Sequence, residues 1–184
     1  MGLDMYLRKE TEIWLPNFLL LSKQNDKDKK NVKKLDTIQE IFPELDKIKD
    51  SNVSTTITQS EDIGYWRKAN AIHNWFVKYV QDENDDCGDY YVSLEKFKEL
   101  LADINEVLSA SEEDREFKAK KYMPPVCGFF FGSQDIDEYY IQSLEYTKDV
   151  VEKVIKDMEK IKNSNQDKNE DYFVKIAYVY TSSW

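Results

Sequence analysis

Apolar and polar residues alternate at the start of the chain, where Leu3, Met5 and Leu7 are the apolar positions. A period of two is typical of a strand with one buried face. The β-branched run Val53–Thr58 predicts a second strand, and we expect the chain to leave that strand by Gly64.

Residues 172–180 alternate like the first strand, but they carry apolar side chains on both faces. Such a pattern is typical of a central strand covered from both sides. We therefore expect the N- and C-terminal strands to pair in one small antiparallel sheet, with helices packed on it.

Helical spacing of apolar residues predicts the other elements. The predicted helical segments are a single turn over 17–21 and helices over 32–42, 66–81, 94–108 and 135–161. Ser93 is the expected N-cap of the 94–108 helix, and the acidic segment 109–114 with Pro124 and Pro125 is expected to close it. Residues 90–92 predict a short extended stretch, and 128–132 a glycine-bracketed loop. The predicted fold class is α+β, with about four to five helices covering the sheet in a single domain over 1–184.

Charge and composition narrow the function classes. The formal net charge of −10 repels phosphate backbones and argues against a protein that coats nucleic acid. An acidic surface that imitates nucleic acid is the alternative use of that charge. Cys87 and Cys127 lie in no zinc or disulfide spacing. The N-terminus does not read as a signal peptide, and the apolar run Leu15–Leu21 is too short to span a bilayer. We expect a cytoplasmic protein with no membrane partner, and the sequence leaves the oligomeric state open.

The segment Gly64–Phe76 is the strongest candidate for a functional surface, because aromatic, cationic and amide side chains crowd into it. If it is helical throughout, Trp66, Asn70 and His73 form one stripe at the edge of the core. The structural alternative is that Asn70 and His73 hydrogen-bond loop backbone while the tryptophans pack. The candidate binding residues, including two outside this segment, are Tyr65, Trp66, Arg67, Lys68, Asn70, His73, Phe131 and Glu138.

The sequence gives little support to any particular reaction or to a metal site. His73 is the only histidine, so histidine acid–base chemistry would have to use it. Pairing His73 with Cys87 as a nucleophile would need a setting that lowers the thiol pKa, and none is visible in the sequence. The acidic loop 82–89 lacks the spacing of a calcium-binding loop, and a solvated turn is the simpler interpretation. Glycine-rich nucleotide motifs, zinc-protease motifs and serine-hydrolase motifs do not occur. We therefore predict no metal and no cofactor, and the sequence leaves open whether the chain is an enzyme.

Three phenylalanines, 129 to 131, stand between two glycines and precede the acidic and aromatic segment 137–140. We expect one or two of these rings to fill the core. A ring left exposed would suit a protein partner, because aromatic side chains dominate interface hot spots.

Five ordered blocks of the sequence resemble a family of small proteins encoded by bacteriophages and prophages. The blocks are MGLDMYL, IGYWRKANAIHNWF, DDCGDYYVS, CGFFFGS with DEYY, and SSW. The resemblance spans most of the chain and brings no catalytic residues with it. It implies a phage accessory protein that binds a host protein or nucleoprotein complex in the bacterial cytoplasm, for example an inhibitor of a host defence system such as CRISPR-Cas. The alternative is a small enzyme or ligand-binding protein with its pocket on the Tyr65–Trp75 segment, where Arg67 or Lys68 would hold an anion and His73 would carry a proton.

Overall fold

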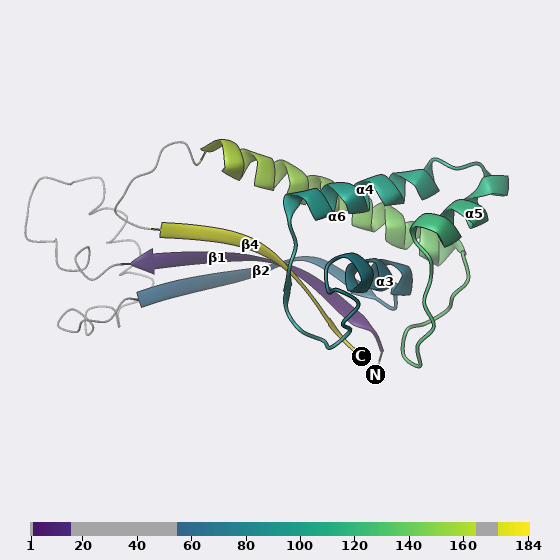
Figure 1. Cartoon of the computed structure of the whole chain (residues 1–184), viewed down its shortest axis with the longest axis horizontal. Helices are drawn as coiled ribbons and strands as arrows, with labels where there is room; N and C mark the ends of the chain where they lie inside the picture. The colour runs from purple at the N-terminus through teal and green to yellow at the C-terminus, as the bar shows by residue number, and fades with distance from the viewer. Residues whose placement is uncertain (1, 16–54, 165–172) are drawn as a thin grey trace, which may run out of the picture. The chain divides into compact units, whose positions relative to one another are not determined.

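The computed structural model describes residues 2–15, 55–164 and 173–184. The helices predicted over 17–21 and 32–42 lie outside these residues. The described part is α+β, as predicted, with an antiparallel sheet and four helices (Figure 1). None of these helices is long and apolar enough to cross a lipid bilayer.

Four strands form the sheet in the order β2-β1-β4-β3. Their bounds are β1 Asp4–Leu15, β2 Thr55–Arg67, β3 Tyr90–Tyr91 and β4 Phe173–Ser183. The N- and C-terminal strands therefore lie side by side in the centre of the sheet, which confirms their predicted pairing. β3 pairs with β4 in antiparallel register, Tyr90 opposite Tyr180.

The residues fall into two compact units. The first holds Met1–Glu10, Ser60–Asp167 and Ala177–Trp184, and the second holds Thr11–Gln59 and Lys168–Ile176. In the second unit, Lys175 forms an ion pair with Glu12 at an Nζ–Oε2 distance of 3.6 Å. All candidate binding residues belong to the first unit. The single domain over 1–184 stays a prediction.

The core of the first unit lies between the sheet and its helices, α3 Asn70–Tyr79, α4 Leu94–Leu108, α5 Glu112–Tyr122 and α6 Glu138–Ser164. Leu3, Met5 and Leu7 are fully buried, as their alternation predicts. From β4, Tyr180 stacks on Phe76 of α3, and Tyr178 meets Phe97 of α4 edge to face. α4 packs against both α5 and α6 (Figure 1).

The 94–108 helix is confirmed with its cap, because the Ser93 hydroxyl accepts from the Lys96 backbone N–H. Asp137 caps α6 in the same way, accepting from the Tyr140 N–H at 2.9 Å. α5 was not predicted, because Ala119 is its only buried residue and no apolar stripe marks it. Its acidic first turn and its lysines at the last turn suit the helix dipole instead.

The prediction that the second strand ends before Gly64, with a helix from Trp66, is wrong. β2 runs through Gly64 to Arg67, and α3 begins only at Asn70. A Cβ at Gly64 would lie 2.7 Å from the Trp66 ring, so glycine here gives room to the side chain two residues on. Trp66 is thus a strand residue, and the predicted helical stripe of Trp66, Asn70 and His73 does not form.

Candidate functional site

A pocket of about 410 Å³ opens where β2 passes into α3, beside the start of α6. Its floor is apolar and includes Ile72 and Leu144, each 1% exposed. The polar side chains around it are Arg67, Lys68, Asn70, Ser133, Asp135, Asp137, Tyr139, Tyr140 and Ser143. Three of the candidate binding residues, Arg67, Lys68 and Asn70, therefore line one cavity.

The backbone at Lys68 is held in an unusual conformation. Lys68 has φ of 57°, a left-handed value that side-chain-bearing residues adopt rarely, and its N–H donates to the Leu3 carbonyl at 2.7 Å. Gly132, with φ of 90°, packs against it, because a Cβ at residue 132 would lie 3.0 Å from the Lys68 Cβ. Strained conformations of this kind persist only where the surroundings enforce them. The wall that carries Lys68 is therefore preorganised.

Two cationic side chains reach the pocket from this wall. Neither the Arg67 guanidinium nor the Lys68 ammonium has a hydrogen-bond or ion-pair partner within the described part of the chain. The main chain beside them is fixed, since the Tyr139 hydroxyl donates to the Arg67 carbonyl. Both charges are thus available to a ligand without the loss of an ion pair to any residue that the structure describes.

Asn70 holds the loop that forms the opposite rim. Its side-chain amide donates to the carbonyls of Phe131 at 3.1 Å and Ser133 at 2.7 Å, and its oxygen accepts from the Val126 N–H at 3.2 Å. Asn70 is 4% exposed, so its side-chain amide loses contact with water, and these three bonds compensate for that loss. This is the structural alternative considered for Asn70, and it makes Asn70 a positioning residue of the pocket.

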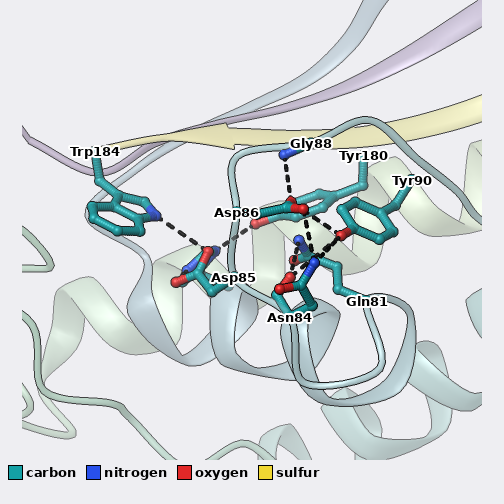
Figure 2. A network of polar contacts seen from close by, with 9 residues as sticks. Gln81, Asn84, Asp85, Asp86, Gly88, Tyr90, Tyr180 and Trp184 are labelled. Carbon is teal, nitrogen blue, oxygen red and sulfur yellow. Dashed lines mark hydrogen bonds and ion pairs between the residues drawn. The ribbon is translucent and has the colours of Figure 1, made fainter.

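His73 lies in a separate, filled region. Its Nδ1 is 2.8 Å from the Tyr180 hydroxyl and its Nε2 is 3.0 Å from the Asp85 carboxylate. Because an ionised carboxylate only accepts, Nε2 carries the hydrogen and Tyr180 donates to Nδ1. Figure 2 shows the Trp184 indole directed toward the same Asp85, whose Oδ1 accepts from it at 3.2 Å.

Burial lowers the pKa of His73 below its ordinary value, while the hydrogen bond and charge of Asp85 oppose that shift. The ring is 1% exposed and both nitrogens are engaged. His73 does not line the pocket that Arg67 and Lys68 share. The geometry therefore gives no support to His73 as a proton carrier for an anion held by Arg67.

Tyr65, Trp66 and Glu138 do not line the pocket. Trp66 is buried, and its indole N–H donates to the Thr147 hydroxyl at 2.8 Å. Tyr65 is exposed and donates to Asp4, a hydrogen bond that raises the pKa of the Tyr65 phenol. Glu138 is exposed and accepts from Gln142.

The phenylalanine loop divides as expected between core and surface. Phe131 is buried, with its ring edge on to His73. Phe129 is 95% exposed and contacts Phe130 edge to face. The exposed ring of this loop is therefore Phe129, whereas Phe131 was the residue named as a binding candidate.

The acidic loop after α3 is organised by its own hydrogen bonds (Figure 2). Asp86 accepts from the Gly88 N–H, from the Tyr90 hydroxyl and from the Asn84 amide. These bonds, the Gly88 one foremost, lower the pKa of Asp86. Over the described residues, no group of three or more metal-ligating side chains comes together.

Sequence reasoning missed half of the pocket. Ser133, Asp135, Asp137, Tyr139 and Ser143 line it from a segment more than sixty residues after Arg67. Gly132 was the available signal, since a glycine between Phe131 and Ser133 indicates a special backbone angle.

Comparison with protein-family models, curated proteins and solved structures finds no match to this chain. The site is therefore described from its own geometry.

Proposed function

We propose that this protein is a binding protein for a small ligand whose anionic group, a phosphate or a carboxylate, is held by Arg67 and Lys68. The observation that carries the proposal is that both cations line one 410 Å³ pocket and have no partner among the described residues. Pockets of several hundred Å³ with an apolar floor and few convergent polar groups are typical ligand sites.

The two cationic side chains would bind the anionic group of the ligand in different ways. The planar guanidinium of Arg67 can donate two parallel hydrogen bonds to a phosphate or carboxylate, whereas the ammonium of Lys68 acts as a point charge. The proposal thus takes up the ligand-binding alternative considered from the sequence, without a role for His73 as a proton carrier.

The double variant Arg67→Ala, Lys68→Ala tests the proposal. Inorganic phosphate, pyrophosphate and malonate would be titrated into the full-length protein by calorimetry, with thermal unfolding in parallel. A ligand at 100 times its Kd stabilises the native state by about 2.7 kcal/mol, which raises Tm by roughly 5–10 °C for a chain of this length. We expect the double variant to bind about 100-fold more weakly, because two charge-assisted hydrogen-bonding groups are lost.

Lys96→Ala, Lys98→Ala is the matched control, since it removes the same charge from α4, where these lysines pair with Glu99 and Glu159. This control should bind like the wild type. The proposal is abandoned if no probe binds the wild type at millimolar concentration, or if both double variants lose affinity equally.

Binding of a host protein is the second candidate function, favoured by the 95% exposure of Phe129 beside Phe130. A large aromatic ring in solvent is a typical interface hot spot. The resemblance to phage proteins implies a component of a host defence system, such as a CRISPR effector, as the partner class. The net charge of −10 would then favour a partner with a basic surface.

Phe129→Ala tests this second function, with Phe117→Ala as the matched control, because Phe117 on α5 is also exposed, at 67%. Purified CRISPR effector complexes and tagged protein would be mixed and analysed by size-exclusion chromatography. A complex that forms with the wild type and with Phe117→Ala, and is at least tenfold weaker with Phe129→Ala, would support it. Equal binding by all three forms, or no complex with any, would count against it.

A further inference from the structure

The pocket carries opposite charges on two walls that come from different elements. Arg67 and Lys68 lie at the end of β2 and just after it, while Asp135 and Asp137 lie in the segment before α6. No ion pair within 4.0 Å joins the two walls in the described structure. A direct ion pair would neutralise the pocket, so the separation leaves both pairs of charges facing the cavity.

On the acidic wall, each carboxylate accepts a hydrogen bond through one of its two oxygens. The Asp135 Oδ2 accepts from the Ser133 hydroxyl at 2.6 Å, and the Asp137 Oδ1 accepts from the Tyr140 N–H at 2.9 Å. The second oxygen of each carboxylate has no hydrogen-bond donor among the residues that the structure describes. Each carboxylate is thus oriented by one oxygen and keeps the other as an acceptor.

The hydroxyl groups around the pocket point to the same chemistry independently. Each hydroxyl has one hydrogen to donate, and all four are used within the protein. Ser133 donates to Asp135, and Tyr139 donates to the Arg67 carbonyl. Ser143 donates to the Tyr139 carbonyl, and Tyr140 donates to the Met123 carbonyl. Their oxygens can therefore only accept from a ligand. Two carboxylates and four accepting hydroxyls suit a ligand that brings hydrogen-bond donors, and a cationic N–H group is the donor that also matches the charge of the carboxylates.

We infer that the ligand is amphoteric: it carries an ammonium or similar N–H-rich cation for the wall of Asp135 and Asp137, and an anionic group for the wall of Arg67 and Lys68. Phosphorylated amines and amino acids are two chemical classes with this pattern. The inference rests on the proposed ligand-binding function and adds the cationic end. Isolated anions such as inorganic phosphate would fill only half of the site.

Matched probes separate this inference from the function it rests on. Phosphoethanolamine and ethyl phosphate differ by one ammonium group, and so do β-alanine and propionate. Calorimetry on the full-length wild type should show at least tenfold tighter binding of the ammonium-bearing member in one pair. The pair that binds identifies the anion as phosphate or carboxylate.

Asp135→Asn, Asp137→Asn should abolish the preference for the ammonium while it keeps the binding of ethyl phosphate or propionate. Asparagine can still accept from Ser133 and can still cap α6, so the fold should be retained, which circular dichroism would verify. Arg67→Ala, Lys68→Ala should lose both members of the pair. Equal wild-type affinity for both members would overturn the amphoteric ligand and leave the anion site standing. Absence of binding by all four probes would overturn both proposals.

Discussion

Replacing Asn70 by alanine is expected to lower the free energy of unfolding by about 2–4 kcal/mol, because three side-chain hydrogen bonds to loop backbone are lost together. The Phe131 carbonyl is left in the core, where an unsatisfied polar group costs about 1–3 kcal/mol. The groups at Ser133 and Val126 are nearer the surface and can reach water. The loop that carries the pocket rim should loosen, so ligand affinity should fall as well.

Urea denaturation followed by tryptophan fluorescence would measure this loss. Asn74→Ala is the matched control, since Asn74 lies on the same helix and its amide makes one bond, to the Pro124 carbonyl at 2.9 Å. We expect that control to cost about 1 kcal/mol. Equal destabilisation by the two variants would contradict the role of Asn70 as the clamp of the loop.

Acidification from pH 7.5 to pH 5.5 is expected to destabilise the wild type through His73. Burial lowers the pKa of His73 in the native state, whereas the unfolded chain has the ordinary value near 6.5. The unfolded state therefore binds the proton more readily. The contribution of neutral His73 is fully present above about pH 6.5 and is lost as pH falls through the native pKa. Charging the ring would also remove the Nδ1 acceptor that Tyr180 uses.

The pH interval isolates this residue, because the chain has one histidine and carboxyl groups ordinarily titrate near pH 4. Urea midpoints at pH 7.5, 6.5 and 5.5 should fall for the wild type and change less for His73→Gln. Proton NMR of the single imidazole in the wild type gives the native pKa directly. A native pKa above 6.5 would show that Asp85 outweighs burial and that acidification stabilises the fold through His73.

The fold was predictable where apolar periodicity is strong. Leu3, Met5 and Leu7 alternate cleanly, and Phe97, Leu100 and Ile104 recur at helical spacing, so each set indicates its own buried face. β4 was predicted as central because it has apolar residues on both faces, and Tyr178, Val179 and Tyr180 are all buried.

Two predictions failed, the end of the second strand at Gly64 and the loop in place of α5. At both places the structure depends on interactions that the local hydrophobic pattern does not record. Gly64 breaks a strand in an isolated sequence, but here it accommodates the Trp66 ring within β2. α5 has charge suited to its dipole and little apolar surface, so periodicity does not reveal it. In both cases the deciding interaction is with a neighbour or with the helix backbone, which hydrophobic spacing does not record.

Two of the candidate residues named from the sequence, Arg67 and Lys68, line the pocket, but nothing in the sequence indicated the shape of the pocket. Arg67 and Lys68 were identified because cationic and aromatic residues crowd together in the sequence. Asp135, Asp137 and Tyr139 reach them only through the folding of α6 back onto β2. His73 belongs to the same segment, but in α3 it is buried and bonded to Tyr180 and Asp85 instead of lining the pocket.

The most direct measurement of ligand binding at the Arg67–Lys68 pocket is a ¹H–¹⁵N NMR titration of the labelled protein with phosphoethanolamine. We expect saturable shifts concentrated at the amides of residues 67–70, 132–135 and 139, with those of α4 and α5 unchanged. Shifts that do not saturate, or that gather on the lysines of α4, would contradict a ligand site in this pocket.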